Sequence, residues 1–369
     1  MGLLRVILAM SVVLTHVGGI SGYYMAGSTP SVQMFYIISG FYMATVLTEK
    51  YDPRTDIGIF YANRSLRIYS IYFVALFITV AGHLALQNFF GQDEWLTYIA
   101  NTGREMSWPE KAWLIFAGLF IIGQEIPLFL RFVDGHLAFT PYGPGIVTPV
   151  WKLMPIPPAW SVSLELMFYC FVPFLIRNGT RILIAIFVGA LLLRVAIYSA
   201  GYDQDPWQMR FFPMELGLFV LGMLARRVYD AHITKIEKRR QVLVVSLFLG
   251  VTCIFQPILD LTSVSDALQA FVVLIYYLSA SIALPCLFQL TRHSKIDGAI
   301  GNFSYPLYLI HWIVFKSYEA FAGRYGWPGH GSLTKTAACV AVSLLVAWLI
   351  VVGVEKPVDR FRHRKIAHT

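Results

Sequence analysis

Apolar runs long enough to cross a lipid bilayer recur along almost the whole chain. A membrane-spanning helix needs about 20 predominantly apolar residues, because the hydrocarbon core is about 30 Å thick. Only 14% of the 369 residues are charged, against roughly 25% in soluble domains. Eleven runs approach the required length, at residues 4–24, 32–48, 68–89, 112–130, 159–176, 182–200, 211–228, 242–261, 268–290, 303–321 and 336–354. The sequence therefore predicts a single all-α integral membrane domain over residues 1–369.

The charges of the loops limit how many of these runs cross the membrane. Cytoplasmic loops are enriched in Lys and Arg, so the basic clusters within 50–67 and 226–240 both belong in the cytoplasm. Five runs lie between them, although an even number of crossings is required. The weakest run is 112–130, which is interrupted by Gly118, Gly123, Gln124, Glu125 and Pro127. We expect this run to be re-entrant or interfacial, which leaves about ten transmembrane helices with both termini in the cytoplasm.

The net charge of +8 does not indicate a nucleic-acid partner. The excess Lys and Arg residues gather in particular loops and in the C-terminal tail, where they set orientation and contact anionic lipids of the bilayer. The four cysteines stand singly in apolar segments without the spacing of metal ligands. No metal site is expected.

Arg5 and His16 are the two polar residues that stand out in the first apolar run. Eleven steps of about 100° return to within about 20° of the starting direction, so both side chains lie on one face of a helix. A rise of about 1.5 Å per residue separates them by about 16 Å, half the hydrocarbon thickness. A titratable ring near the midplane is costly, which makes His16 a functional candidate, although a histidine hydrogen-bonded between helices is the structural alternative.

Arg64 and Arg67 lie three residues apart where the third apolar run begins. Two guanidinium groups on one side of a helix suit a phosphate or pyrophosphate. The alternative is that both residues only anchor the helix at the membrane surface.

Two further runs carry polar residues at helical spacing. Ser161 and Glu165 lie one turn apart in WSVSLELMFY, and a carboxylate there needs a partner such as His16 or an arginine. The alternative for Glu165 is a purely structural ion pair inside the bundle. Ser304, Tyr308 and His311 form one stripe in FSYPLYLIHW, which either holds a substrate or joins helices.

Two other polar positions have a less specific interpretation. Ser39 and Gly40 offer a small surface for helix packing. Glu215 is another intramembrane carboxylate, without an obvious partner.

The order of these motifs resembles the acyltransferase 3 family of membrane O-acyltransferases. The matching features are the spacing of Arg5 and His16, FYIISGFYM, the arginine pair in RSLRIYSIYF, WSVSLE, GNFSYPLYLIHW and the closing EKP at residues 355–357. The resemblance covers residues 3–357. Two positions depart from the family pattern: Gln33 stands where an acidic residue is frequent, and Leu166 replaces a second Glu after Glu165.

The resemblance implies an enzyme of the plasma (inner) membrane that transfers an acyl group, often acetyl, from cytoplasmic acyl-CoA. The acceptor would be a hydroxyl of a carbohydrate or glycolipid, and acyl-CoA would be a co-substrate rather than a bound cofactor. His16 would be catalytic, and Arg5, Arg64 and Arg67 would belong to the functional set. No appended hydrolase-like domain is expected.

We therefore expect His16 to act as general base in direct transfer, with an acyl-histidine intermediate as the mechanistic alternative. We assign Glu165 to the catalytic residues as well. Ser161, Ser304, Tyr308 and His311 join the arginines as candidates for binding substrate or donor. The rival functions are a transporter or flippase with an intramembrane polar path and a structural membrane subunit.

Overall fold

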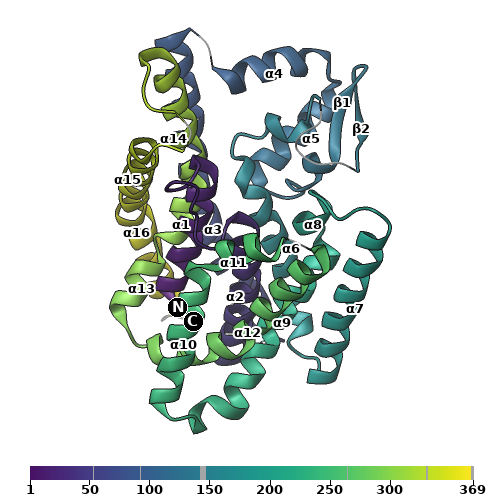
Figure 1. Ribbon diagram of the computed structural model, residues 1–369, viewed down its shortest axis with the longest axis vertical. Coiled ribbons are helices and arrows are strands. Elements are labelled where there is room, and N and C mark those ends of the chain that lie inside the picture. Colours follow the sequence, from purple (N-terminus) through teal and green to yellow (C-terminus); the bar gives the residue numbers. More distant parts are fainter. Residues whose placement is uncertain (53, 92, 142–146, 264, 330, 367–369) are drawn as a thin grey trace.

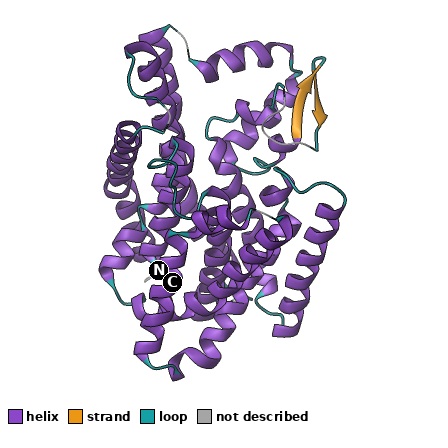
Figure 2. Cartoon of the chain, viewed as in Figure 1, coloured by secondary structure: helices purple, strands orange, loops and turns teal. Residues whose placement is uncertain are grey.

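The computed structural model describes residues 1–366 apart from 53, 92, 142–146, 264 and 330, and the described part of the chain is mostly helical (Figures 1 and 2). The α-helices are α1 (Gly2–Val17), α2 (Ser28–Glu49), α3 (Ile57–Phe90), α4 (Glu94–Glu105), α5 (Trp108–Phe120), α6 (Trp160–Leu175), α7 (Thr180–Ser199), α8 (Trp207–Arg210), α9 (Phe212–His232), α10 (Lys238–Cys253), α11 (Phe255–Thr262), α12 (Asp266–Thr291), α13 (Lys295–Gly301), α14 (Ser304–Tyr325), α15 (Leu333–Ile350) and α16 (Lys356–Ile366). Shorter helical turns are η1 (Ile126–Phe129), η2 (Val150–Leu153), η3 (Pro157–Ala159), η4 (Ile233–Lys235) and the π-helical η5 (Val351–Glu355). Strands β1 (Leu130–Val133) and β2 (His136–Phe139) pair antiparallel, with Leu130 opposite Phe139.

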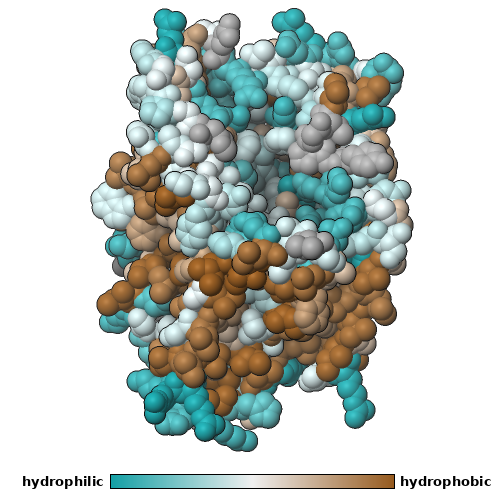
Figure 3. Space-filling model, in the orientation of Figure 1, coloured by the Kyte–Doolittle hydropathy of each residue, from teal (hydrophilic) through white to brown (hydrophobic). Residues whose placement is uncertain are grey.

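Within the described residues, six helices are long and apolar enough to cross a membrane, or seven if α10 and α11 form one bent span. Helix α1 is shorter, and α9 and α14 carry several charged residues each. Apolar side chains form a band across the lower half of the view in Figure 3, and polar side chains gather at both ends. The chain is a multi-pass membrane protein, whereas the predicted number of about ten spans remains a prediction.

Two predicted spans are shorter or more broken than the apolar pattern indicated. The run 4–24 is helical only to Val17, because Gly18 and Gly19 adopt left-handed backbone conformations that end the helix. The run 242–261 is divided into α10 and α11, which meet at an angle of 62°. Pro257 explains this break, since its ring clashes with the carbonyl four residues earlier in a continuous helix.

The interruption predicted within 112–130 is confirmed. Helix α5 ends at Phe120, and the backbone of Ile121 is left-handed with φ 65°. The chain then continues through η1 into the β1–β2 hairpin, so residues 112–130 do not form one continuous helix.

Helix α1 is attached at its start to α13. The Asp297 carboxylate accepts hydrogen bonds from the backbone N–H groups of Gly2 at 2.7 Å and Leu3 at 3.0 Å. Burial alone would raise the pKa of Asp297, but these donors lower the pKa below its usual value. The contact holds the helix that carries Arg5 and His16.

Helices α2 and α9 cross closely at two glycines. A Cβ atom on Gly40 would lie 1.9 Å from the carbonyl oxygen of Phe219, and one on Gly222 would lie 1.9 Å from the carbonyl oxygen of Ile37. Small residues let helix backbones approach in membranes, as was expected for Ser39 and Gly40. The crossing brings α9 against the middle of α2.

We predict that Gly222→Ala destabilises the protein, because the added methyl group has no space between the two backbones. The cost should be at least about 1–3 kcal/mol, the usual range for overpacking. Gly250→Ala in α10 is the matched control, since a Cβ atom there meets nothing within 4 Å. Thermal unfolding of both variants in nanodiscs measures the difference, and equal melting temperatures would contradict the close crossing.

Candidate active site

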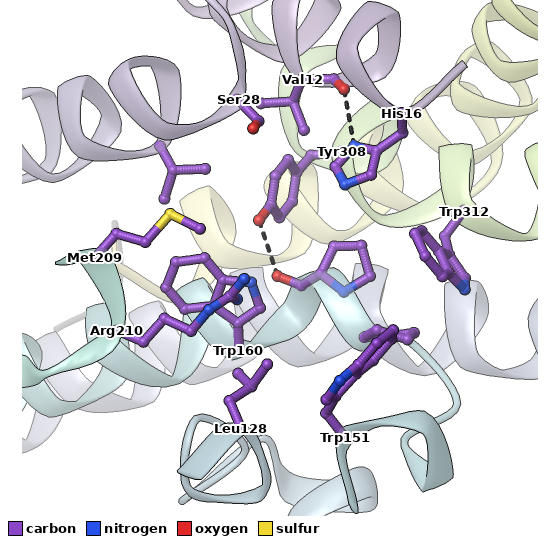
Figure 4. Close-up of a pocket in the computed structure, with 13 residues that line it drawn as sticks. Val12, His16, Ser28, Leu128, Trp151, Trp160, Met209, Arg210, Tyr308 and Trp312 are labelled. Carbon is purple, nitrogen blue, oxygen red and sulfur yellow. Dashed lines mark hydrogen bonds between the residues drawn. The ribbon is translucent and has the colours of Figure 1, made fainter. Parts of the chain in front are cut away.

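A cavity of about 240 Å³ lies where the end of α1 meets α14, α8 and the segment from η2 to η3. Figure 4 shows His16 and Tyr308 on one side and Arg210 and Trp160 on the other. The space-filling view is hollowed between the α1 and α14 side and the α8 side (Figure 3). Among the described residues, the lining is formed by Val12, His16, Ser28, Val32, Leu128, Trp151, Pro157, Pro158, Trp160, Met209, Arg210, Tyr308 and Trp312.

The hydrogen bond of His16 determines which ring nitrogen is basic. Nδ1 lies 2.9 Å from the carbonyl oxygen of Val12, one turn earlier in α1. A carbonyl only accepts, so Nδ1 carries the proton of the neutral ring and Nε2 retains its lone pair. His16 is half-buried and lines the cavity, so this neutral tautomer can accept a proton there.

Helix α14 supports the His16 ring with a second histidine and a tryptophan. The centroid of the His311 ring lies 5.0 Å from that of His16, and the Trp312 ring meets His16 edge to face at 5.6 Å. His311 donates from Nδ1 to the carbonyl of Tyr308 at 2.6 Å, and its buried Nε2 has no hydrogen-bond partner among the residues that the structure describes. His311 is therefore a neighbour of His16, although it is not one of the residues lining the cavity.

Ser161 and Tyr308, predicted on two separate helices, meet in the structure. Their hydroxyl oxygens are 2.7 Å apart, and the Tyr308 hydroxyl donates to the carbonyl of Pro158 at 2.8 Å. The Ser161 hydroxyl also lies 3.3 Å from the Pro158 carbonyl, so the two hydroxyls share this acceptor and either one can donate to the other. The chain of hydrogen bonds fixes the Tyr308 ring in the cavity wall.

The three predicted arginines lie near the other end of α1. Arg67 approaches the buried Glu355 at 4.0 Å, and Arg64 lies over the Phe60 ring. The charges of Arg67, Glu165 and Glu355 all act on Arg5. The structure therefore groups the arginines with two carboxylates, as a cluster distinct from the lining of the His16 cavity.

Glu165 belongs to this arginine cluster by its contacts. Its Oε1 accepts hydrogen bonds from the Ser39 hydroxyl at 2.6 Å and from the Tyr169 hydroxyl. These contacts turn the carboxylate toward α2, into the bundle, and its hydrogen-bond donors are hydroxyl groups rather than His16. Ser304 also lies apart from the cavity lining, because its buried hydroxyl donates to the carbonyl of Gly301 at 2.8 Å.

Arg210 is a cavity residue that the sequence analysis missed. It is 8% exposed, stacks over Trp160 at 4.2 Å and donates to both oxygens of Asp205 at 2.5 and 2.8 Å. One indication was available in the sequence. With the predicted topology, Arg210 precedes a span on the non-cytoplasmic side, where positive charge is disfavoured.

Glu215, which had no obvious partner in the sequence, is paired in the structure. Arg194 of α7 donates to it at 2.7 Å, and the Gln33 amide lies 3.1 Å from both carboxylate oxygens. Gln33, the departure from the family pattern, thus supplies a donor where a second carboxylate would repel Glu215. Among the described residues, no group of three or more His, Cys, Asp or Glu side chains could hold a metal ion.

Comparison with known proteins places the chain in a family. Residues 1–352 match the family model described as an acyltransferase domain. The chain belongs to this acyltransferase family, and it is an O-acyltransferase. Nodulation protein 10 of Rhizobium leguminosarum bv. viciae is 26% identical over 363 residues, which cover 92% of this chain and 84% of the relative. No solved structure matches the chain.

We predict that Tyr308→Phe and Ser161→Ala are coupled in stability, because each removes the partner of the other. The interaction energy should be about 0.5–1.5 kcal/mol. A double-mutant cycle on thermal unfolding in nanodiscs measures it, and Ser65→Ala, an exposed serine on α3, is the uncoupled control. Additive effects of Tyr308→Phe and Ser161→Ala would show that their hydrogen bond does not form.

Proposed function

We propose that this acyltransferase transfers an acyl group, acetyl in the simplest case, from cytoplasmic acyl-CoA to a hydroxyl of a carbohydrate or glycolipid, with His16 as general base. One observation carries the assignment. The hydrogen bond from Nδ1 to Val12 leaves Nε2 of His16 as a proton acceptor in a cavity. A general base works best when the pKa of its side chain lies near the working pH, and histidine is the residue most often used.

In the proposed transfer step, His16 alone accepts the proton of the acceptor and later releases it. The acceptor oxygen attacks the thioester carbonyl, its proton passes to Nε2 of His16, and the new ester bond forms as the C–S bond breaks. The imidazolium then returns the proton to the departing coenzyme A thiolate. Direct transfer needs both substrates at the cavity together, which provides proximity as a source of rate.

The arginine cluster is the proposed grip for the donor. Arg64 and Arg67 offer planar, bidentate contacts to phosphate groups. Arg5 lies near the start of α1, and His16 lies near the end of the same helix. Eleven residues of α1 separate Arg5 from His16 by about 16 Å, a distance that the extended pantetheine arm is proposed to span. Glu165 is proposed to organise this end, since its charge acts on Arg5.

An aromatic cavity suits a sugar acceptor. Trp151, Trp160 and Trp312 line it, and aromatic rings offer flat apolar surfaces beside their polar edges. The family relation supports acyl transfer in general, and the ring-shaped, hydroxyl-rich acceptor is our proposal. Ser304 and His311 do not line the cavity, so we propose that they hold the site in position rather than contact the transferred group.

Contacts between helix ends support the proposed orientation in the plasma membrane. Glu49 pairs with Arg226 at 3.0 Å, and Arg67 approaches Glu355, so residues of the basic loops lie together at one end of the bundle. Because cytoplasmic loops are rich in Lys and Arg, we propose that this end faces the cytoplasm, with both termini on that side. Family membership favours this enzyme over the transporter and structural-subunit alternatives.

We predict that His16→Ala abolishes acyl transfer while acyl-CoA binding changes only a few fold. A general base lowers the barrier to transfer and contributes little to donor affinity. Donor binding and acceptor-dependent turnover are measured on the same protein in nanodiscs, and His293→Ala, an exposed histidine, is the control. Substantial turnover in a well-folded His16→Ala protein would mean that another group removes the proton.

We predict that Arg64→Ala and Arg67→Ala each weaken donor binding by about tenfold or more, as expected for loss of a charge-assisted hydrogen bond. Lysine at either position retains the charge but loses the planar fork, so recovery should be partial. Titration with acetyl-CoA measures the effect, with the exposed Arg54→Ala as the control. Unchanged donor affinity in both variants would remove the arginines from the donor site.

A further inference from the structure

We propose that Arg210 binds the acceptor, and that its pair with Asp205 selects an uncharged sugar over an acidic one. This proposal rests on acyl transfer at His16. Arg210 and His16 line the same cavity, and the charge of Arg210 acts on the His16 ring. An acceptor that contacts Arg210 therefore lies beside the proposed base.

Within the described part of the chain, the hydrogen bonds of Arg210 leave part of its guanidinium group available. Asp205 takes one proton each from Nε and Nη2, which is the side-on mode. A guanidinium group has five N–H donors, so Nη1 and the second proton of Nη2 form a second fork. Since Arg210 lines the cavity, this fork suits two neighbouring oxygen atoms of a ligand, such as vicinal hydroxyls.

The charge balance determines which ligand fits. Arg210 is the one charged residue among the described lining, if His16 is neutral, and Asp205 neutralises it. A carboxylate or phosphate there would give the group a net negative charge beside aromatic walls, where burial of charge is costly. Sugar hydroxyls bind the same fork without that cost. The Trp160 ring beneath the guanidinium holds its plane by a cation–π contact.

A second network holds the segment that carries Arg210. The carbonyl of Gln208, two residues earlier, accepts from Arg194 at 2.8 Å and from Gln33 at 3.3 Å. Tyr277 donates to Gln33 Oε1 at 2.6 Å, which turns the amide nitrogen toward Glu215 and Gln208. We assign Gln33, Arg194 and Glu215 as positioning residues, because they act through α8.

The experiment compares two probes that differ in one group, p-nitrophenyl glucoside and p-nitrophenyl glucuronide. Binding and acetyl transfer are measured in nanodiscs with acetyl-CoA as donor. We expect the wild-type protein to prefer the glucoside. Arg210→Ala should raise the KM for the glucoside about tenfold or more, with the KM for acetyl-CoA within about twofold. Arg181→Ala, an exposed arginine on α7, is the control.

Asp205→Asn is the decisive variant. It leaves Arg210 with its positive charge, so the ratio of kcat/KM for glucuronide over glucoside should rise about tenfold. An unchanged ratio, or a wild-type preference for the glucuronide, would overturn the charge selection. Binding of neither glycoside at millimolar concentration would overturn the sugar site.

The positioning residues are tested without leaving a lone buried charge. The double variant Arg194→Met with Glu215→Gln removes both charges together. It should raise the KM for the glucoside while the KM for acetyl-CoA is unchanged. An unchanged KM for the glucoside would overturn the positioning role.

The two proposals fail in different ways. Retained turnover in His16→Ala, with altered acceptor KM in Arg210→Ala, would contradict the base and leave the acceptor site. Loss of turnover in His16→Ala, with an unchanged acceptor KM in Arg210→Ala, would contradict the acceptor site alone.

Discussion

The close crossing of α2 and α9 determines where the polar groups of this bundle can meet. Gly40 and Gly222 let the two backbones touch, and no side chain separates them there. Two polar residues on α2 near this contact then reach different partners: Gln33 hydrogen-bonds to Glu215, and Ser39 hydrogen-bonds to Glu165. Inside a membrane bundle such polar groups must satisfy one another. The glycine contact therefore fixes the position of Gln33 beside Glu215 and the position of Ser39 beside the Glu165 carboxylate of the arginine cluster.

The loop after His16 shows the same requirement for backbone groups. Helix α1 ends at Gly18, which leaves polar backbone atoms inside the protein. Side chains supply the missing partners: Ser11 donates to the Tyr24 carbonyl and Thr336 to the Gly19 carbonyl, both at 2.7 Å. The break before α11 joins this loop, since Gln256 donates to Met25 and Tyr23 to Cys253. The end of α1, with His16 on it, is thereby held from several sides.

Local patterns in the sequence predicted local properties well and long-range contacts poorly. The apolar runs, the interruption within 112–130 and the packing role of Gly40 follow from residue spacing within one segment. The partner of Glu215 comes from α7, and Arg210 lines the cavity from α8, where Arg194 of α7 and Gln33 of α2 contact the Gln208 carbonyl. Such pairings depend on which helices are neighbours, and periodicity carries no information about that. Pro257 lies inside the apolar run 242–261, and hydropathy alone does not show that this residue divides the run into two helices.

The separation of charge along α1 has a physical reason. A base that must accept a proton is opposed by nearby positive charge, whereas a site for phosphates requires it. Arg5 and its neighbours lie at one end of the helix and His16 at the other, so each proposed function has the electrostatic environment it needs. Arg210 is the exception, because it places a guanidinium group on the cavity that His16, the proposed base, also lines. Its pairing with Asp205 opposes that charge and leaves hydrogen-bond donors for the proposed acceptor.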